Sequence, residues 1–198
     1  MFVLGVDPGL SRCGYGVVER VGRRPRAVAA GVVRTDPALD VPRRLAALQS
    51  ELRTLVAEHR PDVVVVERLL FQVNVRSAIP VAQAAGLAMV EAVAAGSEVV
   101  EYSPNEVKQA VAGHGGADKH QVQRMVQALL GIATPLRPAD AADAVALALC
   151  HLAFAPLRRR TAEAQGGAAR AANRGPQAAR RGGDGRSARA RPHAEVAP

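Results

Sequence analysis

The sequence predicts an α/β fold built on a mixed sheet, and three observations carry this prediction. Apolar runs near residues 3–6, 15–21 and 26–35 are separated by short turns containing glycine and proline, which is typical of an antiparallel meander. Residues 41–60 then change to a helical period, and a run of four valines, 63–66, follows them. Because a helix that crosses between two strands makes them parallel, the sheet should contain both strand orientations.

The first strand and the first helix have clear local end signals. Pro8 and Gly9 stop the first strand after Asp7, because proline lacks an amide donor and glycine permits positive φ. The helix expected at about 41–60 is closed by Pro61 and carries apolar residues at helical spacing on one face: Leu45, Leu48, Leu52, Leu55 and Val56. The four valines that follow have the pattern of a strand buried on both faces.

The sequence between residues 75 and 155 predicts one more strand and four helices. A helix is expected at about 75–95, and its low charge indicates burial on more than one side, either inside the chain or against a partner subunit. A short strand is expected at 98–102. Further helices begin after Ser103, where a capping box is predicted, near Asp118, and near Asp140, the last running to about residue 155.

The charge of the chain is concentrated at its C-terminal end. From residue 157 onward, ten arginines and three acids give a net charge of +7, which leaves +1 of the total +8 for residues 1–156. This tract of Arg, Ala, Gly and Pro has no periodicity and cannot bury enough apolar surface to order itself. We therefore expect a folded domain over residues 1–157 and a disordered basic tail over 158–198.

The N-terminus and the cysteines indicate a cytoplasmic protein without a membrane segment. The first residues lack a basic region and meet Asp7 too early for a signal peptide. No window holds 18 uninterrupted apolar residues. Cys13 and Cys150 show no metal-binding spacing and fit a reducing compartment.

Four acids are candidates for one site. Asp7 and Glu67 each end a strand, and parallel strands place their C-terminal ends on the same edge of a sheet. Asp140 and Asp143 are three residues apart and share a helix face. Each acid alone also has an ordinary structural explanation, as a partner of turn amides or of the helix dipole. Four acids on one edge would repel unless cations lay among them, and Mg²⁺ suits oxygen ligands of this kind. A pair of such ions can activate water and stabilise the leaving oxygen in phosphodiester cleavage.

Basic residues follow the same segments of the chain, and five of them are placed where a phosphate-binding patch would need them: Arg68, Arg76, Lys108, Lys119 and Arg124. Each of these could equally be a solvated surface charge. Phe71 is a rare aromatic residue in this chain, and it can either fill the core or stack on an unpaired base.

Taken together, several motifs resemble the RuvC family of crossover (Holliday) junction endodeoxyribonucleases, from Met1 to about Ala155. The motifs are Val6-Asp7-Pro8-Gly9 with Gly14-Tyr15-Gly16, Glu67 after the valine strand, Pro104-Asn105-Glu106-Val107-Lys108-Gln109, Lys119 with Gln121-Val122-Gln123, and Ala139-Asp140-Ala141-Ala142-Asp143-Ala144. The resemblance implies a ribonuclease-H-like fold, with a five-stranded mixed sheet and helices on both faces. It also implies a homodimer that acts in recombination and DNA repair, with the RuvA–RuvB branch-migration complex as partner. The enzyme would bind a four-way DNA junction and make paired symmetric nicks on strands of like polarity, leaving 5′-phosphate and 3′-hydroxyl ends.

The same resemblance assigns roles to particular residues. The metal-binding catalytic acids would be Asp7, Glu67, Asp140 and Asp143, holding two Mg²⁺ ions per subunit, with Mn²⁺ as a substitute. Lys108 and Lys119 match catalytically important lysines near the DNA. DNA contacts are further expected from Arg68, Leu70, Phe71, Asn74 and Arg76. The base-stacking phenylalanine of the family falls at Leu70, with Phe71 one residue later, and the helix from residue 75 would lie at the dimer interface.

Two other classes of function compete with this interpretation. Sugar kinases and actin-like ATPases also open their phosphate loop with Asp-x-Gly after a first strand, but they need two related domains, for which this body is too short. A structure-specific DNA-binding protein without catalytic activity would bind four-way DNA and show no Mg²⁺-dependent nicking.

Overall fold

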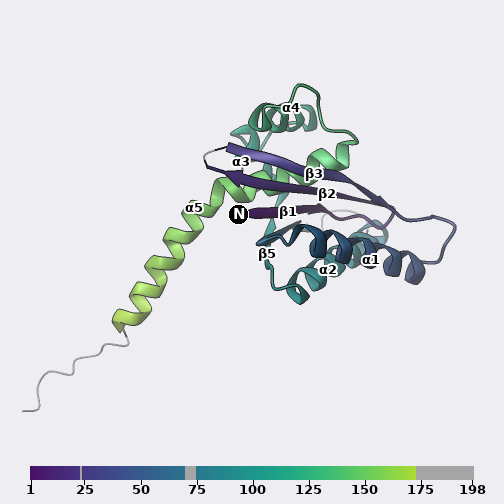
Figure 1. Ribbon diagram of the computed structural model, residues 1–198, viewed down its shortest axis with the longest axis horizontal. Helices are drawn as coiled ribbons and strands as arrows, with labels where there is room; N and C mark the ends of the chain where they lie inside the picture. The colour runs from purple at the N-terminus through teal and green to yellow at the C-terminus, as the bar shows by residue number, and fades with distance from the viewer. Residues whose placement is uncertain (23, 70–74, 173–198) are drawn as a thin grey trace, which may run out of the picture. The chain divides into compact units, whose positions relative to one another are not determined.

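Five strands form a mixed sheet in the computed structural model, which describes residues 1–22, 24–69 and 75–172 (Figure 1). The strands lie in the order β3-β2-β1-β4-β5, and their bounds are β1 Phe2–Asp7, β2 Arg12–Val21, β3 Arg24–Arg34, β4 Val63–Glu67 and β5 Glu98–Tyr102. The first three strands pair antiparallel, whereas β1 with β4 and β4 with β5 pair parallel. The predicted meander and the predicted parallel crossover are both confirmed.

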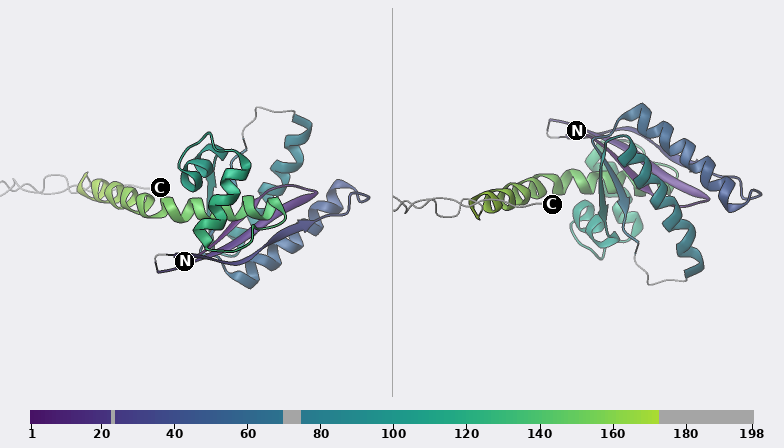
Figure 2. Two further views of the ribbon diagram at one scale, coloured as in Figure 1. Left: turned by 90° about the horizontal axis from the view of Figure 1, so that it is seen from above. Right: turned by 90° about the horizontal axis from the view of Figure 1, so that it is seen from below.

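Five helices within these ranges cover the sheet: α1 Val41–His59, α2 Val75–Ala94, α3 Pro104–Ala112, α4 Lys119–Leu130 and α5 Ala139–Ala172. The helices α1 and α2 pack on one face, and α3, α4 and the first part of α5 pack on the other (Figure 2). The capping box predicted at Ser103 is present, and a second one forms at Asp118. Asp40 caps α1 by accepting a hydrogen bond from the backbone amide of Arg43.

The valines of β4 show why this strand sits inside the molecule. Val63 and Val65 belong to the core shared with α3, α4 and α5, whereas Val64 and Val66 belong to the core shared with α1 and α2. All four are at most 4% exposed, as expected of a parallel strand covered on both faces. Burial of the strand fixes its register. Its last residue, Glu67, is therefore held at the C-terminal end of the parallel strands, beside the end of β1.

Among the residues that the structure describes, helix α2 is covered on one side only. Its alanines pack in the core with α1 and the sheet, and its buried Glu91 forms an ion pair at 3.0 Å with Arg53 of α1. On the outer side, Ile79, Val90 and Val93 are 52%, 59% and 66% exposed. The low charge of this helix therefore reflects burial on one face within the chain and an exposed apolar face on the other.

The end of α5 differs from the prediction. The helix was expected to end near residue 155 and residues 158–198 to be disordered, but α5 continues to Ala172. Residues 157–172 are mostly Ala, Arg, Glu, Gln and Leu, whose intrinsic helix propensity favours the longer helix. The first compact unit of the chain is Met1–Arg159, and residues 173–198 of the predicted tail lie outside the described residues.

The segment Ala139–Pro156 of α5 is long and apolar enough to cross a membrane by length and composition alone. In this fold 67% of that segment is buried, and residues from Val145 to Leu152 belong to the core on the α3 and α4 side of the sheet. The apolar character of the segment is thus explained by its place as the central helix of that core.

Candidate active site

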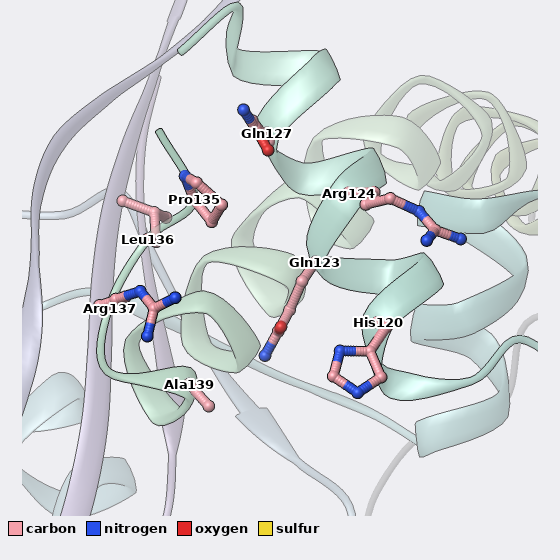
Figure 3. Close-up of a pocket in the computed structure, with 8 residues that line it drawn as sticks. All are labelled: His120, Gln123, Arg124, Gln127, Pro135, Leu136, Arg137 and Ala139. Carbon is pink, nitrogen blue, oxygen red and sulfur yellow. The ribbon is translucent and has the colours of Figure 1, made fainter. Parts of the chain in front are cut away.

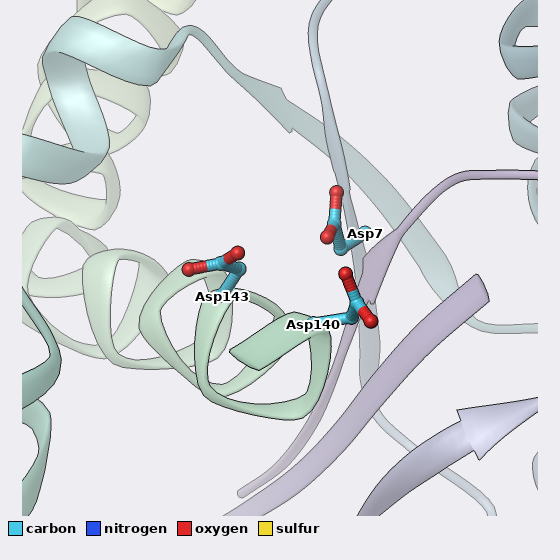
Figure 4. A group of neighbouring side chains, drawn as sticks. All are labelled: Asp7, Asp140 and Asp143. Atoms are coloured by element: carbon cyan, nitrogen blue, oxygen red, sulfur yellow. The ribbon is translucent and has the colours of Figure 1, made fainter. Parts of the chain in front are cut away.

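Three carboxylates converge at one edge of the sheet (Figure 4). Asp7 is the last residue of β1, and Asp140 and Asp143 lie in the first turns of α5. One carboxylate oxygen from each lies within 4.8 Å of the others. Asp7 is more than 130 positions away in sequence from the two helix acids, so the fold and not the local chain brings it to them.

Glycines allow this convergence by letting α5 lie directly on the strands. A Cβ atom at Gly14 of β2 would lie 2.2 Å from the backbone oxygen of Asp140, and one at Gly5 of β1 would lie 1.9 Å from that of Ala144. Any side chain at these positions would push the helix away from the sheet. The close approach therefore sets the position of the two helix carboxylates relative to Asp7.

Glu67 joins the group through a cavity of about 230 Å³ that we call the carboxylate cavity. Its charged lining comes from Asp7, Glu67, Lys108, Lys119 and Asp143, and its apolar lining from Pro104, Val107, Val122, Ala146 and Leu147. The parallel pairing of Val6 with Val66 places Asp7 and Glu67 at neighbouring strand ends. Asp140 lies beside Asp7 and Asp143 but does not line this cavity.

Burial and the closeness of the acids raise the pKa values of two of them. Burial, reinforced by the negative charges of Glu67, Asp143 and Asp140, raises the pKa of Asp7 from its ordinary value of 3.8 to about 7. Burial and the charge of Asp143 also raise the pKa of Glu67. Both shifts mean that the acids resist holding all their negative charge at once, so a bound cation would relieve the repulsion.

Two basic side chains already supply part of this counter-charge. Lys119 Nζ donates to Asp143 Oδ2 at 2.7 Å, and this hydrogen bond raises the pKa of Lys119. Arg12 Nε donates to Asp140 Oδ2 at 2.8 Å. Sequence reasoning missed Arg12, the first residue of β2, because only its closeness in sequence to Asp7 distinguished it from other surface arginines.

The loop between Asp7 and Arg12 is itself anchored to α1. Arg44 Nη2 donates to Ser11 Oγ at 2.5 Å, and Arg44 Nε donates to Thr35 Oγ1 at 2.9 Å. The buried Thr35 hydroxyl in turn donates to the carbonyl of Leu10 at 2.6 Å. These bonds fix the turn between Asp7 and Arg12, so the arginine is held where it can reach Asp140.

The remaining predicted site residues have mixed outcomes. Arg68 lies at the edge of the site but is engaged with the protein, since Nη1 is 3.7 Å from Glu106 Oε2 and Nη2 donates to the carbonyl of Glu101 at 3.3 Å. Leu70, Phe71 and Asn74 lie outside the described residues. Arg76 is in the first turn of α2, and its side chain is likewise outside the described part of the chain.

The donor set fits a hard divalent cation. Carboxylate oxygens converge from three acids, a fourth acid lines the adjoining cavity, and neither imidazole nor thiolate takes part. Mg²⁺ and Mn²⁺ prefer ligands of this type, whereas Zn²⁺ sites usually include nitrogen or sulfur donors.

Comparison with known proteins places this arrangement in one family. Residues 3–151 match the family model for crossover junction endodeoxyribonuclease RuvC. The RuvC protein of Salinispora arenicola is 53% identical over 175 residues, which cover 88% of this chain and 100% of that protein. That of Moorella thermoacetica is 47% identical over 84% of this chain and 99% of its own length.

Solved structures agree in fold. Thermus thermophilus RuvC in complex with a Holliday junction substrate superposes with a TM-score of 0.76 at 37% identity, covering 79% of this chain and 96% of that one. The yeast mitochondrial Holliday junction resolvase Ydc2 shares the fold, with a TM-score of 0.58 at 16% identity. The predicted ribonuclease-H-like fold, a five-stranded mixed sheet with helices on both faces, is confirmed. The chain belongs to the RuvC family of crossover junction endodeoxyribonucleases.

Proposed function

We propose that this chain is a metal-dependent endonuclease that resolves four-way DNA junctions. The observation that carries the proposal is the meeting of Asp7, Asp140 and Asp143 within 4.8 Å, in a family whose Thermus thermophilus member has been solved with a Holliday junction substrate. Neighbouring Glu67 supplies the fourth acid.

The carboxylates would hold two Mg²⁺ ions, which Mn²⁺ could replace. When bound, such ions activate a water molecule and stabilise the leaving oxygen of a phosphodiester. Lys119 stays protonated, because its pKa is raised, so it acts as a fixed positive charge toward the phosphate and not as a base. Lys108 lines the same cavity and contributes a second positive charge there.

Dimerisation would account for paired cuts. The exposed apolar face of α2, formed by Ile79, Val90 and Val93, is the kind of surface that a second copy covers. A two-fold symmetric dimer presents two identical sites, which fits symmetric nicks on strands of like polarity. Hydrolysis would leave 5′-phosphate and 3′-hydroxyl ends that a ligase can join.

Further parts of the proposal rest on the sequence alone. Arg68, Leu70, Phe71, Asn74 and Arg76 would contact the junction, with Leu70 or Phe71 stacking on an unpaired base. The basic tail would add salt-sensitive attraction to DNA. The setting would be cytoplasmic recombination and repair, with the RuvA–RuvB branch-migration complex as partner.

A gel assay on a synthetic four-way junction, with and without Mg²⁺, tests the proposal. We expect paired nicks in Mg²⁺ that ligase can seal, and binding without nicking in EDTA. Binding without nicking in both conditions would show a DNA-binding protein that lacks catalytic activity. ATP hydrolysis in the absence of DNA would favour the ATPase class instead.

A further inference from the structure

We propose that a second cavity, lined by His120, Gln123, Arg124, Gln127 and Arg137, binds backbone phosphates of the DNA strand whose scissile phosphate lies at the carboxylates. We call it the basic cavity. It has a volume of about 400 Å³ and is completed by Pro135, Leu136 and Ala139. The proposal rests on the proposed function, because it concerns the same DNA strand.

The basic cavity adjoins the carboxylate site through the chain itself. His120 on its wall follows Lys119, whose ammonium group bonds to Asp143. Ala139 on the opposite wall precedes Asp140. Consecutive Cα atoms are about 3.8 Å apart, so both walls begin one residue from the site. A DNA strand carries one phosphate per roughly 3.4 Å of helix axis, so a strand held at the carboxylates brings further phosphates within reach.

The charge of the basic cavity suits an anion. None of its eight lining residues is acidic, whereas two are arginines. Among the residues that the structure describes, neither Arg124 nor Arg137 forms an ion pair with an acid. The pKa of Asp118 at the start of α4 is lowered by a hydrogen bond from the backbone of Gln121 and, to a smaller extent, by the charge of Arg124. The body of the protein carries a net charge of only +1, so two arginines beside one cavity without acidic lining form a local positive patch.

The side chains are arranged to meet an extended ligand and not a small enclosed one. In Figure 3, Arg137 and Gln123 extend toward the space between α4 and the loop before α5, and His120 lies at its end. Arg124 also lines the cavity, but in this view its side chain points from α4 away from Arg137. Both arginines are exposed, which fits contacts with a backbone that runs past the surface.

Binding at several salt concentrations tests this assignment, with a labelled four-way junction in EDTA so that no cleavage occurs. We expect Arg137→Ala with Arg124→Ala to weaken binding about tenfold and to lower the slope of log affinity against log salt by about one to two. Arg137→Lys should restore part of the slope. Nicking in Mg²⁺ at saturating junction should stay within about threefold of wild type, since the double variant leaves all four acids and both lysines in place.

Arg24→Ala is the matched control, because Arg24 is exposed and lies at the opposite end of the sheet from Asp7, where it pairs with Val21. A double variant with the same affinity and salt slope as this control would overturn the phosphate assignment. So would a double variant that binds normally but nicks slowly at saturation. Failure of the wild-type protein to nick junctions would instead overturn the proposed function, so the two failures are distinguishable.

Discussion

The carboxylate cavity and the basic cavity lie on either side of the start of α5, yet they are built in opposite ways. In the first, half-buried acids are fixed on strand ends and on a helix that rests on glycine, and burial, reinforced by the mutual repulsion of the acids, raises the pKa of Asp7 to about 7. In the second, exposed arginines lie on a helix and a loop, and none of the residues that line the cavity is acidic. Chemistry on a phosphate needs rigid, crowded charge, whereas holding a long backbone needs exposed charge that can adapt.

The largest expected effect separates the roles of the two cavities and comes from the removal of one acid. We expect Asp7→Asn to lower the nicking rate in Mg²⁺ by at least about a thousandfold, because a metal ligand is lost. Junction binding in EDTA should stay within about threefold, because the cationic side chains are untouched. Single-turnover nicking and fluorescence anisotropy measure the two quantities. Full nicking activity in this variant would refute the assignment of the site.

The crowding of the acids also predicts a pH dependence of stability in the metal-free protein. Asp7 binds its proton more tightly in the fold, at a pKa of about 7, than in the unfolded chain, at about 3.8. This contribution to stability is present at low pH and is lost as the pH rises through about 7. Between pH 5 and pH 8 it should fall by roughly 3 kcal/mol, measured by urea denaturation in EDTA.

Asp7→Asn provides the control for that measurement, because asparagine does not titrate. The variant should lose most of the pH dependence and should be more stable than wild type at pH 8. Equal pH profiles for the two proteins would mean that burial and the neighbouring acids do not raise the pKa of Asp7. Adding Mn²⁺ at pH 8 should stabilise only the wild type strongly.

The helix contact offers a milder perturbation that leaves every charge in place. Gly14→Ala would bring a methyl group against the backbone of Asp140, so α5 must shift and the carboxylates must separate. We expect nicking to fall about a hundredfold and stability to fall by about 1–3 kcal/mol. Gly116→Ala is the matched control, since its nearest atom would be 3.8 Å from the new Cβ. A Gly14→Ala protein that nicks like the control would show that the close approach is unimportant.

The smallest expected effect concerns the basic tail. Truncation after Leu157 removes ten arginines and three acids but none of the residues that line either cavity. The salt dependence of junction binding should become less steep, while nicking at saturating junction should stay unchanged. An unchanged salt slope would count against a DNA role for the tail.

Much of this architecture could be predicted from the sequence, because strong local signals agree with the fold. Four consecutive valines, the capping box at Ser103 and the helical leucines of α1 each fixed one element. The meeting of Asp7 and Glu67 followed from parallel strand ends.

The contact between Gly14 and Asp140 could not be predicted, because it joins residues far apart in sequence through the close approach of a strand and a helix. Arg12 was missed for the same reason, since its partner Asp140 is 128 positions away. The length of α5 was underestimated because the predicted end relied on the loss of apolar periodicity and not on the helix propensity of residues 157–172.

The most direct test is to measure how many divalent cations the metal-free protein binds and with what affinity. Electron paramagnetic resonance with Mn²⁺ should show saturable binding to the wild type. Asp7→Asn and Asp143→Asn should each weaken this binding by at least about tenfold. Glu98→Gln, which changes an exposed acid at the start of β5, should leave it unchanged. Equal Mn²⁺ affinity in all four proteins would contradict the claim that acids from β1 and α5 meet to hold a cation.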